Sequence, residues 1–127
     1  MQLDRIGQIA IPVMDIERSI AFYRDTLGMK FLFKAPPALA FFMCGDVRLM
    51  LSETEAERFK NHSSVLYYKV ADIQASFAEL KGHAVKIESE PHLIAKMPDH
   101  DLWMGFFYDP DDNLLALMSE VREGARG

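Results

Sequence analysis

Two short stretches of the chain repeat each other, and this repeat constrains the fold more than any other feature. Residues 13–21 read VMDIERSIA and residues 70–78 read VADIQASFA, so five of nine positions are identical. The offset is 57 residues (70 − 13), which is close to half of the 127-residue chain. Self-similarity over such a distance predicts two similar structural units in tandem.

Both copies show the same order of elements. Asp15 and Asp72 each follow an apolar run and precede an amphipathic pattern, so each is predicted to cap a helix with its carboxylate. The helices are expected to end at Gly28 and Gly82, because glycine adopts the left-handed conformation that ends helices. The predicted strands are 8–13, 29–35, 39–45 and 47–52 in the first copy, and 65–70, 84–89, 102–108 and 114–119 in the second.

The predicted fold class is α+β, with two tandem βαβββ modules. The first module covers about residues 6–53 and the second about residues 63–121. Residues 54–62 are predicted to form a linker with some helix, and residues 122–127 a C-terminal tail. Each helix covers one face of its sheet, and the sister module is the simplest partner for the other face. We therefore expect residues 1–127 to form a single domain with pseudo-twofold symmetry, whose mixed sheets curl round a central cleft.

Charge and composition restrict the partners. A net charge of −5 argues against nucleic acid, which requires a basic surface. The longest apolar stretch, residues 35–45, is too short to span a membrane. Cys44 is the only cysteine and is predicted to be buried; with no export signal, this predicts a cytoplasmic protein. Eight methionines and fourteen aromatic residues exceed what one small core needs, which predicts a homodimer.

Two motifs carry a family resemblance. Residues 9–29 read IAIPVMDIERSIAFYRDTLGM and residues 106–118 read FFYDPDDNLLALM. Over residues 6–121 the chain resembles the vicinal oxygen chelate superfamily, which includes glyoxalase I, bleomycin-resistance proteins and extradiol dioxygenases. Asp112 stands where that family usually has glycine. The resemblance implies the fold, whereas function varies within the superfamily from catalysis to binding alone.

The resemblance also implies a divalent metal site in the cleft, with one ligand from the first and last strand of each module. The matching positions in this chain are Gln8, Met50, Val65 and Ala116. Only Gln8 carries an oxygen donor, and a single neutral amide cannot hold a divalent ion. We therefore predict no metal at the usual site, and no other cofactor.

Strand alternation predicts the remaining cleft residues. Met104 and Phe106 are expected to face the helix. Arg48 and Lys69 could bind a carboxylate or phosphate, or could remain solvated at strand ends. An apolar cleft with few polar groups is typical of a small-molecule pocket, and a filled core is the alternative. The predicted cleft residues are Gln8, Arg48, Met50, Tyr67, Lys69, Trp103, Phe107 and Ala116.

Residues 91–103, PHLIAKMPDHDLW, are predicted to form a long loop, and long loops in compact domains are often functional. Three interpretations of its histidines remain open. His92 could be a general acid or base, since histidine titrates near neutrality. His92, His100 and Asp101 could form a displaced metal site. Both histidines could also be solvated surface residues.

Three functions follow from these observations. The first is a glyoxalase- or dioxygenase-like protein that has lost its metal site and binds an apolar small molecule, with or without an anionic group. The second is a non-catalytic protein that sequesters a ligand, as in bleomycin resistance. The third is an enzyme of the lyase, isomerase or dioxygenase type that uses a displaced metal or a histidine base in residues 91–103.

Overall fold

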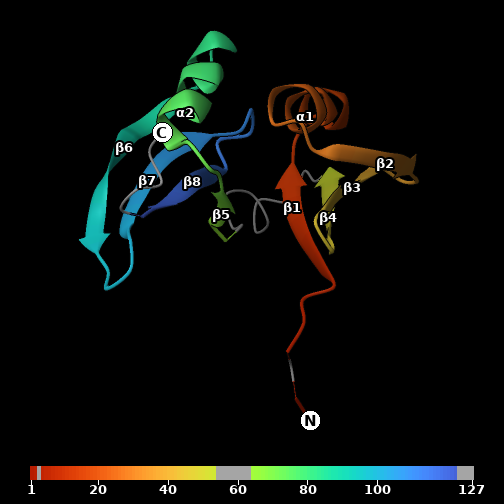
Figure 1. Cartoon of the computed structure of the whole chain (residues 1–127). Helices are drawn as coiled ribbons and strands as arrows, with labels where there is room; N and C mark the ends of the chain where they lie inside the picture. Colours follow the sequence, from red (N-terminus) through yellow and green to blue (C-terminus); the bar gives the residue numbers. More distant parts are fainter. Residues whose placement is uncertain (3, 54–63, 123–127) are drawn as a thin grey trace. The chain divides into compact units, whose positions relative to one another are not determined.

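The chain divides into two compact units, Met1–Ser64 and Val65–Gly127, drawn in a computed structural model in Figure 1. The structure describes residues 1–2, 4–53 and 64–122. The predicted linker and nearly all of the predicted tail lie outside these residues. Within the described residues, no helix is long and apolar enough to cross a membrane.

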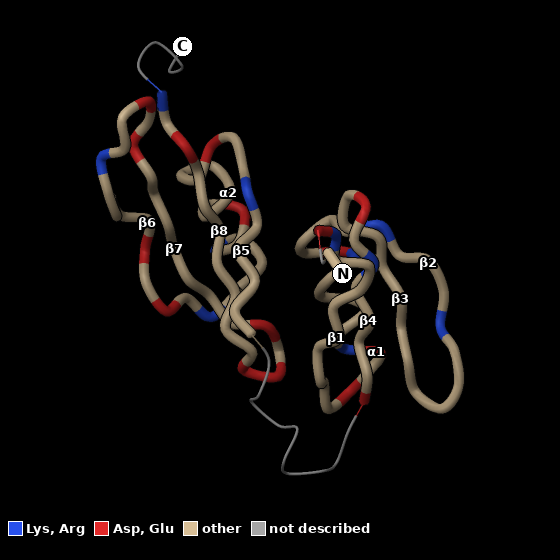
Figure 2. Tube along the Cα trace, turned by 90° about the horizontal axis from the view of Figure 1, so that it is seen from below, with Lys and Arg blue, Asp and Glu red and all other residues tan. Residues whose placement is uncertain are grey.

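The first unit, module 1, is a four-stranded mixed sheet with one helical segment. The strand order is β1-β4-β3-β2, where β1 and β4 run parallel and the other neighbours run antiparallel. Figure 2 shows the strands side by side, with charged residues mostly at strand ends and connections. The elements are β1 Gln8–Val13, α1 Ile16–Ala21, η1 Phe22–Thr26, β2 Lys30–Ala35, β3 Leu39–Cys44 and β4 Val47–Glu53.

The helical segment of module 1, formed by α1 and η1, begins and ends where the sequence predicts. The Asp15 carboxylate accepts a hydrogen bond from the Arg18 amide at 3.1 Å, which satisfies a free donor of the first turn. The helix continues through a π-helical turn, η1, up to Gly28, which has a φ of 69°. Ile20 and Tyr23 are buried on the side that packs on the sheet. The tilted contact between Tyr23 and Phe42 of β3, at 6.0 Å between ring centroids, fixes this packing.

The second unit, module 2, repeats the same architecture. Its strand order is β5-β8-β7-β6, again with the first and last strands of the module parallel. The predicted α+β class with two βαβββ modules is confirmed. The single domain and the central cleft stay predictions. The elements are β5 Leu66–Lys69, α2 Ile73–Gly82, β6 Ile87–Lys96, β7 Asp101–Tyr108 and β8 Leu114–Val121.

Helix α2 starts and ends where predicted, but the left-handed residue after it is not the glycine. The Asp72 carboxylate accepts from the Ala75 amide at 3.1 Å, as Asp15 does in module 1. Gly82 is the last residue of the helix, as predicted, and the amide of the capping residue His83 bonds back to the Glu79 carbonyl at 3.2 Å. The left-handed residue after the helix is Ala84, with a φ of 58°.

The prediction of a long loop at residues 91–103 is wrong, because most of this segment is strand. Strand β6 reaches Lys96 and pairs with β7 from Asp101, so only a tight turn remains, closed by the Met97 amide on the His100 carbonyl at 2.7 Å. Pro91 is tolerated because β6 is an edge strand, where a missing amide donor breaks no ladder. Three register shifts in β6 interrupt the alternation of its side chains, so the sequence of β6 lacks the regular polarity pattern of a strand.

The strand register makes the two modules equivalent position by position. In module 1, Ala10 pairs with Met50 across the parallel strands. In module 2, Tyr67 pairs with Ala116 in the same way. The first strands are thus related by the 57-residue offset of the sequence repeat, and Met50 and Ala116 occupy matching positions.

Candidate functional site

Each sheet has one face covered by its own helix and a second face that we call its distal face. In module 1, the buried residues Ile11, Leu49 and Leu51 mark the helix side. Their neighbours in sequence point the other way, since side chains alternate along a strand. By register, the distal face carries a first row of Gln8, Arg48, Met43 and Lys30, and a second row of Ala10, Met50, Phe41 and Phe33.

Arg48 contacts both a polar and an aromatic side chain of this face. Its guanidinium lies over the Phe41 ring, 5.3 Å from the ring centroid, and its Nε donates to the Gln8 Oε1 at 2.7 Å. Phe41 is itself stacked on Phe33, with centroids 4.8 Å apart and planes 30° apart. Within the described parts of the chain, Arg48 makes no ion pair with a carboxylate. The face therefore combines a stacked aromatic pair with a cation whose charge is not neutralised.

The residues at the family's metal positions do not fit a divalent ion. The Gln8 oxygen already accepts from Arg48, and the Gln8 Nε2 lies 3.8 Å from the Met50 sulfur. A cation bound at Gln8 would also meet the positive charge of Arg48. The matching residues of module 2, Val65 and Ala116, offer no side-chain donor atoms.

The sequence prediction missed Lys30, Phe33 and Phe41, and for Lys30 and Phe33 the cause is a bulge in β2. Phe31 pairs with Phe42 and Phe33 pairs with Phe41, so Leu32 is an extra residue that changes the alternation. Phe31 consequently contacts Phe42 on the helix side, at 5.4 Å between centroids, while Phe33 faces away. Simple alternation puts both phenylalanines on one face, and no turn residue in KFLFKA signals the bulge.

The distal face of module 2 is built differently. Tyr67, 47% exposed, meets Phe106 edge to face at 5.9 Å between centroids. Ala116 lies between these two residues in the register and is fully buried. Lys69, the cation of this face, has its ammonium 3.3 Å from the Glu120 carboxylate. As predicted, Tyr67, Lys69 and Ala116 share one face, but the Lys69 charge is paired.

Two predicted site residues, Trp103 and Phe107, are on the wrong face. Phe107 is fully buried and meets Phe77 of α2 edge to face at 6.2 Å, so it belongs to the helix side. Trp103 lies four residues earlier on the same strand, hence on the same side, and its indole nitrogen is buried without a hydrogen-bond partner in the described residues. The prediction that Phe106 and Met104 face the helix is inverted accordingly, as the contact of Phe106 with Tyr67 requires.

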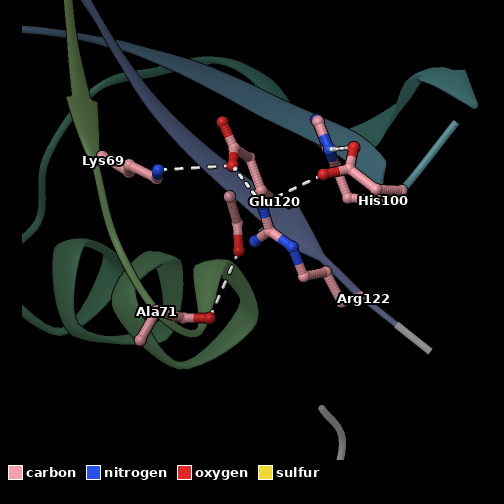
Figure 3. A network of polar contacts seen from close by, with 7 residues as sticks. Lys69, Ala71, His100, Glu120 and Arg122 are labelled. Atoms are coloured by element: carbon pink, nitrogen blue, oxygen red, sulfur yellow. Dashed lines mark hydrogen bonds and ion pairs between the residues drawn. The ribbon is translucent and has the colours of Figure 1, made fainter. Parts of the chain in front are cut away.

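A chain of charged groups surrounds Glu120 at the edge of this face. Figure 3 shows Lys69 and Arg122 both directed at the Glu120 carboxylate, each 3.3 Å away. Arg122 also reaches Asp99 at 3.6 Å, and the Asp99 carboxylate accepts from the His100 Nδ1 at 2.7 Å. The hydrogen bond from Lys69 lowers the pKa of Glu120, and the hydrogen bond from His100 lowers the pKa of Asp99. This network joins β5, β8 and the turn before β7.

The two histidines of residues 91–103 do not share a site. His100 is in the turn and faces Asp99, whereas His92 lies four residues before Lys96, the last residue of β6, or roughly 13 Å from the start of the turn at the rise of a strand. No three His, Cys, Asp or Glu side chains are grouped as metal ligands anywhere in residues 1–2, 4–53 and 64–122. A displaced site made of His92, His100 and Asp101 therefore has no support in this geometry.

Two further side chains have definite surroundings. His92 is exposed, and its Nδ1 donates to the Glu90 carbonyl at 2.9 Å, which leaves Nε2 with the lone pair in the neutral ring. Cys44 is exposed at the end of β3 beside Gly45. The prediction that Cys44 is buried is wrong, because the strand ends there and turns into β4.

Comparisons with known proteins agree with this architecture. A profile of the Glyoxalase/Bleomycin resistance protein/Dioxygenase superfamily matches residues 5–117. The uncharacterized protein YraH of Bacillus subtilis (strain 168) is 29% identical over 129 residues, covering 89% of this chain and 96% of YraH.

Solved structures share the fold at low sequence identity. The virulence protein STM3117 of Salmonella typhimurium has a TM-score of 0.77 and 22% identity, over 95% of this chain and 100% of that one. TnmS3, an antibiotic binding protein from Streptomyces sp. CB03234, has a TM-score of 0.73 and 22% identity, over 94% and 98%. With its two βαβββ modules and the extent of the profile match, this chain belongs to the Glyoxalase/Bleomycin resistance protein/Dioxygenase superfamily.

Proposed function

We propose that this protein binds an apolar small molecule without chemical conversion and without a metal at the superfamily position. The observation that carries the proposal is the set of side chains at the four matching positions. Gln8 is engaged by Arg48 and Met50, and Val65 and Ala116 have no donor atoms in their side chains. A site without ligands for a divalent ion cannot stabilise an oxyanion through one.

The distal faces support binding. Each carries an aromatic pair, Phe33 with Phe41 in module 1 and Tyr67 with Phe106 in module 2. Phe33 and Tyr67 remain 48% and 47% exposed, although burial of such rings is favourable. TnmS3, which shares the fold, is an antibiotic binding protein, so this architecture is compatible with binding as a function.

The test is equilibrium binding of a neutral aromatic probe to metal-free protein. Isothermal titration of 2-naphthamide in buffer with EDTA should give saturable binding, and chromatography should recover the probe unchanged. Binding that requires added Zn²⁺, Mn²⁺, Ni²⁺ or Fe²⁺, or recovery of a converted probe, would contradict the proposal.

A histidine-dependent enzyme is the second candidate, because His92 has a defined tautomer with a free Nε2. A base at this position would exchange acidic carbon-bound protons of a bound ligand. The test is incubation of 2-acetonaphthone with protein in D₂O, followed by mass spectrometry of the recovered ketone. Deuterium uptake above the buffer rate that disappears in His92→Gln would favour catalysis over binding alone.

We also propose a homodimer in a reducing cytoplasm. Leu93, Ile94 and Met97 are 40%, 44% and 45% exposed at the end of β6, and a second copy could cover them. The exposed thiol of Cys44 suits a compartment that keeps thiols reduced. Sedimentation equilibrium should give twice the 14.5 kDa chain mass, and Ile94→Lys should shift it to the monomer mass.

A further inference from the structure

We propose that the distal face of module 1 binds planar aromatic carboxylates, with the ring on Phe33 and Phe41 and the carboxylate held by Arg48 and Lys30. This inference rests on the proposed binding function and names the class of ligand. It also assigns the site to one module.

The aromatic part of the site is already assembled. Phe33 and Phe41 stack with centroids 4.8 Å apart, and they come from neighbouring strands on one face of the sheet. Phe33 is 48% exposed, so a further ring can cover it. Offset stacking on such a pair selects planar aromatic groups over branched aliphatic ones.

The charged residues on this face are all positive. Arg48 and Lys30 flank Met43 on the two strands beside it, so their Cα atoms are about 10 Å apart at the usual strand spacing. Both side chains are long enough to meet above Met43. In a protein of net charge −5, the face is unusual because none of its register positions is acidic. These positions are Gln8, Arg48, Met43, Lys30, Ala10, Met50, Phe41, Phe33, Pro12, Ser52, Leu39 and Ala35.

Gln8 gives the site its geometry. Its Oε1 accepts from the Arg48 Nε at 2.7 Å, and its Nε2 is directed to the Met50 sulfur. The Nε of Arg48 is thereby occupied, and the two terminal NH₂ groups remain to bind a carboxylate end-on through two parallel hydrogen bonds. Gln8 is therefore a positioning residue, located where relatives are expected to bind a metal.

The experiment compares two probes of the same shape, 2-naphthoate and 2-naphthamide, by isothermal titration of the full chain in EDTA. We expect wild-type protein to bind the carboxylate at least about tenfold more tightly than the amide, as a charge-assisted bidentate contact provides. Arg48→Met should remove this preference and leave 2-naphthamide within about twofold of wild type. Phe33→Ser should weaken both probes, since it removes the stacked ring.

Variants of Gln8 test the positioning role. Gln8→Glu puts a carboxylate against Arg48, so naphthoate binding should fall as far as in Arg48→Met while naphthamide binding is retained. Gln8→Ala should weaken naphthoate binding less than Gln8→Glu does. The pH range over which binding varies should be no broader in Gln8→Ala than in wild type. The control is Lys81→Met, which removes one positive charge from α2 in the other module, where Lys81 pairs with Glu90. It should bind both probes as wild type does.

The outcomes separate this inference from the proposed function. Equal affinities for the two probes, or a carboxylate preference that survives Arg48→Met, would overturn the inference and leave binding itself intact. Failure of both probes to bind would overturn the inference together with the proposed function. Circular dichroism of each variant should match that of wild type, because the substituted side chains lie on an exposed face.

Discussion

At one pair of matching positions on helix and sheet, the two modules divide the side-chain volume differently. In module 2, the Phe77 ring of α2 packs directly on Gly105 of β7, where a Cβ would come within 2.5 Å of the ring. The matching residues of module 1 are Ile20 on α1 and Ala40 on β3, both buried. A larger helix residue thus accompanies a smaller strand residue. The pair, and not either residue alone, keeps the helix at its place on the sheet.

The distal faces differ in charge rather than in volume. Phe41 and Phe106 occupy matching positions, and each has an aromatic partner. The cation of module 2, Lys69, is paired with Glu120, whereas Arg48 of module 1 contacts only neutral groups among the described residues. One backbone plan therefore supports one face suited to anions and one whose charge is internally satisfied.

The largest effect is expected from breaking the packing pair of module 2. Gly105→Ala should lower the free energy of unfolding by about 3 kcal/mol, because the buried Phe77 ring cannot move aside. Urea denaturation followed by Trp103 fluorescence measures this change.

The double variant Gly105→Ala with Phe77→Ile recreates the pair of module 1. It should lose at least about 1 kcal/mol less than the sum of the single variants, since neighbouring residues are not additive. Ala40→Gly is the control in module 1 and should cost only about 1 kcal/mol, for one buried methyl group. Strict additivity in the cycle would mean that the two residues do not form a pair.

The ends of the helices in the two modules differ in backbone strain. The left-handed residue is Gly28 in module 1, with a φ of 69°, and Ala84 in module 2, with a φ of 58°. Ala84→Gly should stabilise the protein by up to about 1 kcal/mol, and Gly28→Ala should destabilise it by about as much. A Cβ at Gly28 would meet no atom within 4 Å, so only strain is tested. Changes of the same sign in both variants would exclude strain as the cause.

Acid should weaken module 2 through its charged network. The pKa values of Glu120 and Asp99 are lowered in the folded state, so their contribution is present above the unfolded values of about 4 and is lost as pH falls through the folded values. The urea midpoint should therefore start to fall below about pH 5. In Glu120→Gln this fall should be smaller, and an identical pH profile would show that Lys69 and Arg122 contribute nothing through Glu120.

The smallest effect is a gain of binding. Glu120→Gln frees Lys69, so module 2 should acquire weak affinity for 2-naphthoate. This affinity should be a few-fold higher than that of the same protein with Glu120 in place. The titration is best made in an Arg48→Met background, where module 1 no longer favours the anion. Glu79→Gln on α2 is the control for the change in net charge. If both variants gain equally, general charge and not the release of Lys69 is responsible.

The sequence predicts the order of helices and strands better than it predicts which side of the sheet each strand residue faces. Asp15, Asp72 and Gly28 act as their chemistry indicates, and the repeat correctly predicts two modules. Residues 102–108 of strand β7, LWMGFFY, are apolar on both faces, so alternation cannot assign their sides. Gly105 was the available signal, because a glycine within a strand often marks close approach by another element.

The site was only partly predictable for related reasons. Gln8, Arg48 and Met50 are on one regular strand pair and were placed together correctly. Lys30 and Phe33 depend on the bulge at Leu32, which arises from pairing with β3 and leaves no local mark in the sequence. Likewise, the pairing of Lys69 with Glu120 joins strands about fifty residues apart in the chain and cannot be read from either stretch alone.

The parallel pairing of β1 with β4 sets the order of events during synthesis. Within its sheet, and among the residues that the structure describes, strand β1 pairs with one strand, β4, the last strand of its module, and Gln8 bonds to Arg48 forty positions later. At about 5 to 20 residues per second, a ribosome needs about 2 to 8 s to add those forty residues. During that interval β1 has no partner in its own module, and helix α1 has an incomplete sheet to pack on. Once Glu53 has emerged, module 1 has all of its strands and can close before module 2 is complete, so the first half of the chain can fold while the second is still being made.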